Sequence, residues 1–322
     1  MPGTIHTRKD ETKMQTDLRN HGKRISMKWF KDGWQLYLLI LPAIIYVLLM
    51  NYLPLFGVQI AFKNYRPSRG ILGSPWAGLK YFKQFIDYPN FWLIISNTLR
   101  ISLYNLLTFP CAVVFALLLN EIRNTTLKKS IQMVTYAPHF MSTVVVCSMV
   151  LLFLRKDSGM INNLLSLLGL ERQEFINVPN YFEDIYVWSG VWQNLGWNSI
   201  IYISALSGVS NDQVEAARID GANRLDIIRH INIPSIMPTI VIMLILACGN
   251  ILSVGFEKTF LLQKSLNLSR SQVISTYTYE VGLKSAQYSY SSAIGLFNTV
   301  VNFLMLILVN AISRRVSDVS IW

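Results

Sequence analysis

The chain has 322 residues, of which 52% are hydrophobic and only 15% are charged. A soluble globular domain is roughly one quarter charged, so this composition argues against a large soluble protein and for one that faces lipid. The formal net charge of +11 could suggest nucleic acid, but the placement of the basic residues fits membrane topology better, and we expect no nucleic-acid partner.

Six stretches that contain no Asp, Glu, Lys or Arg run through the chain, each between 20 and 30 residues long. They are Gly33–Phe62, Ile101–Asn120, Ser130–Leu154, Ile185–Asn211, His230–Phe256 and Ser285–Ser313. Because about 20 apolar helical residues cross the hydrocarbon core, each stretch supplies one crossing and none supplies two. Leu36–Met50 shows no polar face of the kind found in a soluble helical bundle. The sequence therefore predicts an all-α polytopic membrane protein with six transmembrane helices.

The N-terminal tail, residues 1–32, is polar and carries eight basic residues. Such clusters stay in the cytoplasm, so the tail is predicted to be cytoplasmic and residues 33–322 to form the transmembrane domain. An even number of crossings then returns Arg314 and Arg315 to the cytoplasm. Basic residues between the first and second stretches fall on the predicted outer side, so this orientation depends on the tail and on the loop described below.

Three longer connections, residues 63–92, 155–184 and 257–284, are expected outside the cell. Ser158–Leu170 in the second of them is apolar but too short to cross, so an interfacial or re-entrant helix is expected there. Arg100, at the start of the second span, is expected to extend its guanidinium to the outer interface.

The connection between the fourth and fifth spans, residues 209–234, is predicted to be helical and cytoplasmic. Asn211 or Asp212 can cap it, and Asp212 and Glu215 have the spacing of a capping box. Small or apolar residues recur three or four apart along it, as in an amphipathic helix on the membrane surface. They are Val214, Ala217, Gly221, Leu225 and Ile228.

Gly221 lies on that stripe and needs a reason, because a helical glycine costs about 1 kcal/mol relative to alanine. A bend or the close approach of another backbone would provide one. Pro234 and Pro238 then mark the start of the fifth span. The pattern alone leaves open whether this connection only separates two spans or docks onto a partner.

Residues in this connection resemble the E-A-A-x3-G-x9-I-x-L-P signature of ABC importer permeases. The matching residues are Glu215, Ala216, Ala217, Gly221, Ile231 and Pro234. The spacing agrees at every step, and Ile233 stands where the family usually has Leu. Other stretches resemble the carbohydrate branch of that family, the LplB-like permeases. These are Pro54–Lys63, Gly73–Leu79, Asn97–Leu99, Leu117–Ile122 and Ala137–Phe140.

This resemblance implies a MetI-like fold of the type I importers, in a bacterial plasma membrane. It implies two separate ATPase subunits that hydrolyse ATP, a second permease that often differs from the first, an extracellular solute-binding protein, and an oligosaccharide substrate. The segment with Glu215 and Gly221 would insert a short helix into a groove of one ATPase subunit. The sequence has no P-loop, nucleophile elbow or metal-binding pattern, so we expect no catalytic site, cofactor or metal in this chain.

Polar and aromatic side chains inside the fourth and fifth predicted spans are candidates for the substrate pathway, since polar groups within a membrane are costly and often functional. The candidates are Trp192, Gln193, Asn194, Asn198, Asn250 and Ser253. Trp188 fits better in an interfacial aromatic belt. The small and polar residues of the fifth span could equally form a surface that packs against another helix.

Three other functions stay open from the residues. The first is a permease of the same class for a solute other than a sugar, because the docking segment does not contact substrate. The second is an ion-coupled transporter, which the lack of Asp and Glu within the six stretches disfavours. The third is an intramembrane enzyme, which is disfavoured because no paired carboxylates or nucleophile–base set is present.

Overall fold

The structure is a computed structural model that describes residues 34–316 and residue 320. The described chain is helical, and its only extended pairing is an isolated bridge between Lys63 and Trp76. It divides into two compact units, Met1–Gln59 and Ile60–Trp322, which are described separately below. The tail predicted at residues 1–32 lies outside the described residues.

The first unit holds most of one long apolar helix, whose last three residues, 60–62, belong to the second unit. It begins with α2 (Trp34–Val47) and continues through a π turn, Leu48–Tyr52, and a 3₁₀ segment, Leu53–Phe62. Together they form an apolar helix of 29 residues, which matches the first predicted span. No side chain of α2 is buried within the chain, as expected of a helix that is apolar on every face.

Four helices of the described chain are long and apolar enough to cross a membrane. They are Trp34–Phe62, Phe91–Asn120, Arg224–Cys248 and Tyr288–Arg315. The second consists of α5 (Phe91–Leu107) and α6 (Pro110–Asn120), the third ends in α13 (Ile233–Cys248), and the last is α17 (Tyr288–Val316). These helices correspond to the first, second, fifth and sixth predicted spans.

The third predicted span is not straight. It consists of α7 (Thr125–Tyr136), the turn Ala137–Phe140 and α8 (Thr143–Phe153), and the two halves meet at 101°. Proline in the turn lacks an amide donor and disfavours a continuous helix. The fourth predicted span is α10 (Phe182–Leu206), whose 25 residues are enough to cross but whose amides and tryptophans make it less apolar.

The predicted start of the second span was wrong. The second span begins ten residues earlier than predicted, at Phe91, so Arg100 lies inside a helix. Its guanidinium donates to Glu183 Oε1 at 3.3 Å instead of extending to an interface alone. Arg270, in α15 (Leu268–Ser271), pairs with the same oxygen at 3.2 Å. Glu183 therefore links α5, α10 and α15.

The segment predicted as the last outer loop, residues 257–284, is part of the core. It contains α14 (Phe256–Leu262) and α16 (Ile274–Tyr279). Ile274, Tyr277 and Val281 are spaced three and four apart and pack against α4 (Lys80–Ile86), α5 and α17. The interleaved Ser, Thr and Gln residues hide this periodicity in a hydropathy average.

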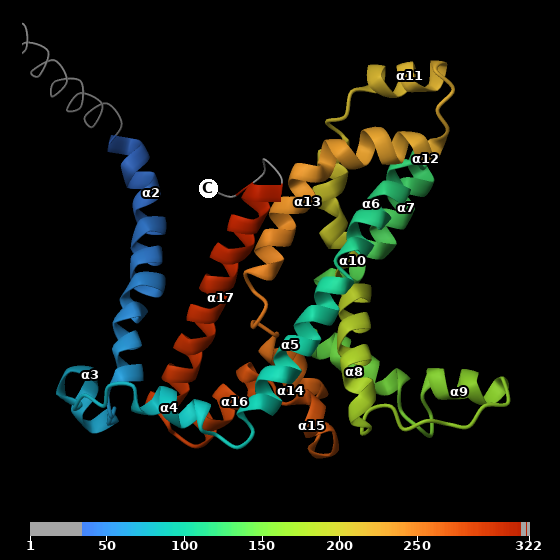
Figure 1. Cartoon of the computed structure of the whole chain (residues 1–322). Helices are drawn as coiled ribbons and strands as arrows, with labels where there is room; N and C mark the ends of the chain where they lie inside the picture. The colour runs from blue at the N-terminus through green and yellow to red at the C-terminus, as the bar shows by residue number, and fades with distance from the viewer. Residues whose placement is uncertain (1–33, 317–319, 321–322) are drawn as a thin grey trace, which may run out of the picture. The chain divides into compact units, whose positions relative to one another are not determined.

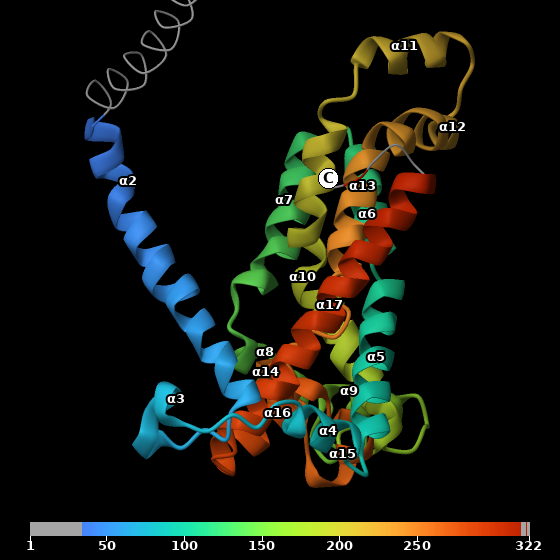
Figure 2. The ribbon, with the colours of Figure 1, turned by 60° about the vertical axis from the view of Figure 1, so that its left-hand side comes forward.

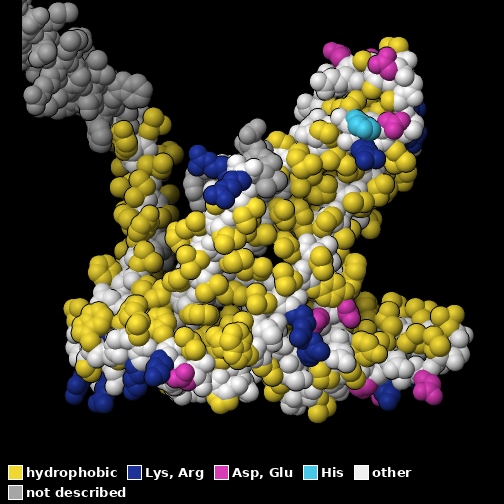
Figure 3. Space-filling view, viewed as in Figure 1, with side chains coloured by type: hydrophobic (Ala, Val, Ile, Leu, Met, Phe, Trp, Pro, Cys, Tyr) yellow, Lys and Arg dark blue, Asp and Glu magenta, His cyan; other side chains and the backbone are white. Residues whose placement is uncertain are grey.

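Charged side chains lie mainly toward the two ends of the second unit, and the surface between the ends is hydrophobic (Figure 3). One end carries α3 (Gly70–Gly73), α4, α16 and α9 (Met160–Leu167) (Figure 1). The other end carries α11 (Asn211–Ile219), α12 (Arg224–Ile227) and the C-terminal end of α17, and a second view agrees (Figure 2). The short α9, with 8 residues, lies where an interfacial or re-entrant helix was predicted and is too short to cross.

Candidate functional site

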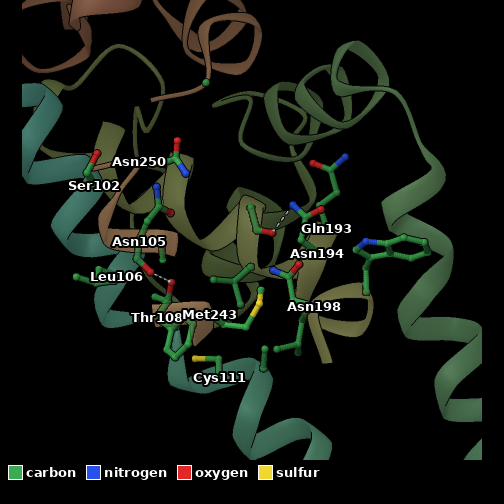
Figure 4. Close-up of a pocket in the computed structure, with 18 of the residues that line it drawn as sticks. Ser102, Asn105, Leu106, Thr108, Cys111, Gln193, Asn194, Asn198, Met243 and Asn250 are labelled. Atoms are coloured by element: carbon green, nitrogen blue, oxygen red, sulfur yellow. Dashed lines mark hydrogen bonds between the residues drawn. The ribbon is translucent and has the colours of Figure 1, made fainter. Parts of the chain in front are cut away.

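A cavity of about 790 Å³ opens between α5, α6, α10 and the end of α13 (Figure 4). Its α5–α6 wall runs from Ser102 to Ala112, the middle part of the helix Phe91–Asn120. The cavity therefore lies about halfway along a crossing helix, at the depth where transporters commonly bind substrate.

Five of the six candidates for the substrate pathway line this one cavity. They are Gln193, Asn194 and Asn198 from α10, with Asn250 and Ser253 from the chain after α13. Trp192 is not among the lining residues, and its side chain is 46% exposed. Gln193, Asn194 and Asn198 lie on one side of the cavity, and Asn105 and Asn250 lie on the other (Figure 4).

The placement of Asn250 and Ser253 within a fifth span was wrong. That helix ends at Cys248, and the residues after it form a turn. Asn302 of α17 holds this turn, since its Nδ2 donates to Ser253 Oγ at 2.8 Å and its Oδ1 accepts from the Leu252 amide at 2.9 Å. The turn brings Asn250 and Ser253 to the wall of the cavity.

Two of the α10 amides also hold the right-angle bend between α7 and α8. Gln193 Nε2 donates to the Met141 carbonyl at 3.2 Å, and Asn194 Oδ1 lies 2.9 Å from His139 Nδ1. The His139 ring stacks on Trp197 with centroids 4.3 Å apart and planes within 5°. His139 thus has a packing role at the bend.

Asn105 and Asn198 present unused amides to the cavity. Neither side chain forms a hydrogen bond with another residue of the described chain, although both lie against the hollow. Asn105, Ser102 and Thr108 lie on the same wall and were not among the residues predicted from the sequence. The signal was present, because these three polar residues follow one another at intervals of three and so share one face of an apolar helix.

Lys258 is the one charged side chain among the residues that line the cavity. It was predicted to belong to an outer loop, because Glu257 and Lys258 end a charge-free stretch. The structure instead folds α14 back against α8 and α10. The cavity walls are otherwise neutral, with amides, hydroxyls and aromatic rings.

The predicted coupling segment is two helices joined by a tight turn. Gly221 follows α11 with φ +86°, in the left-handed region that favours glycine. The Gly221 amide donates to the Arg218 carbonyl at 3.1 Å, and the Ala222 amide to the Ala217 carbonyl at 2.9 Å. This pair of bonds is a Schellman motif, so the glycine is required by the bend that ends α11.

The predicted capping box was wrong. Ser210 begins α11 without a side-chain cap, and the capping box lies instead at the start of α12. There, Asn223 Oδ1 accepts from the Asp226 amide at 3.1 Å and Asp226 Oδ2 accepts from the Asn223 amide at 3.0 Å. This capping box fixes the turn at the start of the continuous helix Arg224–Cys248, of which α13 is the last part. The fifth span therefore begins at Arg224 and not at Pro234 or Pro238.

The six signature residues fall on both parts of this unit. Glu215 and Ala216 are exposed on α11, Ala217 is half-buried, and Gly221 is exposed at the turn. Ile231 lies in a π turn, Ile228–Asn232, that precedes Pro234 in the first turn of α13. A Cβ atom at position 221 would meet no other part of residues 34–316 or 320 within 4 Å, so the outer surface of the turn is open.

A helical membrane protein with a polar cavity at mid-span and a rigid helical projection at one end has the parts of a transport permease. The chain belongs to the family described as binding-protein-dependent transport system inner membrane component, which matches residues 94–318.

Two named relatives agree with this assignment. The polygalacturonan/rhamnogalacturonan transport system permease protein YteP of Bacillus subtilis is 40% identical over 93% of this chain and 94% of its own length. Protein LplB of the same organism is 40% identical over 88% and 90%. These relatives span nearly the whole chain, so the similarity extends well beyond the coupling signature.

A solved structure of a bacterial alginate ABC transporter, in complex with an alginate pentasaccharide-bound periplasmic protein, contains a similar chain. It matches with a TM-score of 0.84 and 37% identity, over 91% of this chain and 99% of that one. The predicted all-α, MetI-like permease fold is confirmed.

Proposed function

We propose that this chain is the permease subunit of an ATP-driven importer that carries an oligosaccharide across the bacterial plasma membrane. The observation that carries the proposal is the amide-rich cavity at mid-span. Asn105, Asn198 and Asn250 offer both donors and acceptors, as sugar hydroxyls require. Trp197 adds an aromatic wall against which sugar C–H groups can pack.

The named relatives favour a carbohydrate over other solutes. YteP is named for polygalacturonan and rhamnogalacturonan, and a solved relative is described as importing the acidic polysaccharide alginate. We extend the class of substrate, a carbohydrate, to this chain. Its cavity of about 790 Å³ is large enough for a short oligosaccharide and too large to be specific for a single ion.

ATP is bound and hydrolysed by two separate ATPase subunits, and this chain transmits their motion. The exposed tip of the α11–α12 unit carries Ile219 at 87% exposure and Leu225 at 75% exposure. Apolar residues this open at the end of a rigid projection fit an interface with a partner. The signature residues Glu215, Ala216, Ala217, Gly221, Ile231 and Pro234 belong to this unit, and we assign them to ATPase coupling.

Two further partners complete the assembly. A second, different permease subunit closes the pathway from the other side, and a solute-binding protein delivers the sugar at the α4–α9 end. The α11–α12 end, the C-terminal end of α17 and the N-terminal tail face the cytoplasm. Trp192, which lies outside the cavity of this chain, is assigned to the pathway only within that larger assembly.

The test is uptake by the complete transporter, with its ATPase, partner permease and binding protein, reconstituted in proteoliposomes. A panel of labelled oligosaccharides, amino acids and peptides is offered with ATP or with an ion gradient inside the vesicles. ATP-dependent uptake of an oligosaccharide supports the proposal. Uptake of only amino acids or peptides would make this a permease for another solute, and uptake on the gradient without ATP would exclude the ABC mechanism.

A further inference from the structure

The positive charge of Lys258 lies at the wall of the cavity without a carboxylate to neutralise it. Lys258 is half-buried in α14 and lines the cavity with the amides of α5 and α10. Both ion pairs found among residues 34–316 and 320 go to Glu183, which leaves no carboxylate of that part of the chain paired with Lys258. A desolvated charge without a partner is costly, so its retention calls for a reason.

Neutral groups of α10 hold the ammonium in place. Lys258 Nζ donates to the Tyr186 carbonyl at 2.6 Å and lies 4.7 Å from the centre of the Tyr186 ring. Both contacts favour a cation but leave its charge uncancelled. An ammonium has three donors, and the carbonyl takes one, so the remaining donors are available to a ligand.

Gly190 leaves room for this arrangement. A Cβ atom at position 190 would lie 3.0 Å from Lys258 Nζ, closer than an ordinary contact. The glycine is also a lining residue of the cavity, so the ammonium sits where α10 has no side chain to cover it. The absence of a side chain therefore keeps the charge next to the hollow.

Burial lowers the pKa of Lys258 to about 8, chiefly because desolvation disfavours the charged form. The ionisable groups near it are the Cys147 thiol of α8, the Tyr186 phenol of α10 and Glu257 on α14 itself. Lys284, after α16, lies against Phe260 of the same helix, on the aromatic face of α14. At neutral pH most Lys258 side chains are still charged, and an anion beside the ammonium would raise the pKa again.

We propose that Lys258 is the counter-charge for an anionic sugar, so that the substrate is a uronate oligosaccharide whose carboxylate binds at the α14 side of the cavity. The neutral amides of α5 and α10 then take the hydroxyls of the same chain. This inference rests on the proposed oligosaccharide import and specifies the charge of the substrate.

The experiment compares a galacturonate pentasaccharide with the same chain after its carboxylates are reduced to alcohols. ATP-dependent uptake of each is measured in proteoliposomes that contain the complete transporter. Wild-type permease is compared with Lys258→Met, which removes the ammonium but keeps an unbranched side chain only one atom shorter, and with Lys258→Arg, which keeps the charge. Lys264→Met, an exposed lysine two residues beyond the end of α14 and outside the cavity, removes the same charge elsewhere.

We expect Lys258→Met to lower uptake of the acidic chain by about tenfold or more and uptake of the reduced chain by less than about twofold. Lys258→Arg and Lys264→Met should keep most of the acidic uptake. Because the binding protein is the same throughout, its own preference cancels when the variants are compared. Gly190→Ala, which pushes the ammonium away, should shift uptake in the same direction as Lys258→Met.

A pH series gives an independent readout. As the pH rises through 8 and beyond, deprotonation of Lys258 should lower the ratio of acidic to reduced uptake in the wild type. The guanidinium of Lys258→Arg stays charged over that range, so the ratio should stay constant. Taking the ratio removes the pH dependence of the ATPase subunits.

Three results would overturn the inference. Lys258→Met could lower both substrates equally in an assembled transporter, which would make Lys258 a packing residue of α14. It could leave acidic uptake unchanged, which would exclude a role for the charge. Wild-type permease could import only the reduced chain, which would refute the anionic substrate and leave oligosaccharide import standing. Import of no sugar at all would instead refute the proposed function.

Discussion

Gly196 determines how closely α10 approaches α7. A Cβ atom at this position would lie 2.5 Å from the Thr135 carbonyl oxygen and 2.7 Å from Tyr136 Cδ1. The first obstacle is backbone, which cannot rotate away as a side chain can. The close contact falls next to the bend at Ala137–Phe140, and α10 is also a wall of the cavity.

We therefore expect Gly196→Ala to destabilise the protein by about 1–3 kcal/mol, as overpacking of a filled interior does. The purified permease in detergent should unfold at a lower temperature than the wild type. Gly295→Ala is the matched control, because it lies in α17 and its Cβ would meet nothing within 4 Å. Equal melting temperatures for the two variants would contradict the close approach of α7 and α10.

The cavity shows what a sequence can and cannot reveal about single residues. Gln193, Asn194 and Asn198 could be predicted, since amides are conspicuous inside a charge-free stretch. Asn105 was equally conspicuous in hindsight. Lys258 could not be predicted from its neighbours, because only the folding of α14 against α10 brings its charge to the cavity wall.

At the scale of elements, the coupling unit combines a rigid turn with an open outer surface. Gly221 has φ +86°, and within the described part of the chain a Cβ atom at this position would have no neighbour within 4 Å. Substitution therefore disturbs the turn through backbone strain and also places atoms where an ATPase subunit would contact the unit. Gly169 ends α9 with the same geometry, φ +76° and open surroundings, at the opposite end of the second unit.

We predict that Gly221→Asp inserts into the membrane normally but no longer couples ATP hydrolysis to uptake. ATPase subunits should co-purify with this variant at a small fraction of the wild-type yield, and sugar uptake should fall by about tenfold or more. Gly169→Asp carries the same strain and charge and should retain the ATPase subunits. Wild-type uptake by Gly221→Asp, or loss of the ATPase from both variants, would argue against docking at this turn.

The elements themselves were predictable where their residues are uniformly apolar, as in Trp34–Phe62 and Tyr288–Arg315. The elements were less predictable where contacts between distant helices determine a bend or the burial of a segment. The right-angle bend after Tyr136 depends on Gln193 reaching the Met141 carbonyl from another helix. The buried segment around α16 alternates apolar and polar residues, so its membership in the core became visible only with its partners α4 and α17.

At the scale of the whole molecule, the order of helices places α11, α12 and the C-terminal end of α17 together at one end of the second unit (Figure 1). The predicted orientation requires this, because an even number of crossings returns the chain to the side on which it started. Basic residues alone did not decide the matter, since Lys80 and Lys83 of α4 lie at the other end. The proposal that the α11–α12 end is cytoplasmic therefore needs a direct measurement.

Single cysteines can make that measurement. In a variant without Cys111, Cys147 and Cys248, we expect Lys80→Cys to react with a membrane-impermeant maleimide in intact spheroplasts. Asp220→Cys and Arg315→Cys should react only in inverted vesicles. The native side chains at the three labelled positions, Lys80, Asp220 and Arg315, are exposed, so burial within the chain does not limit the reaction. The permease is expressed without its ATPase, which would otherwise cover Asp220.

If Asp220→Cys and Arg315→Cys react from opposite sides of the membrane, an odd number of spans separates them and the six-span topology fails. If both react from the outside, the ATPase cannot reach the α11–α12 unit, and the coupling role assigned to Glu215–Pro234 fails with it.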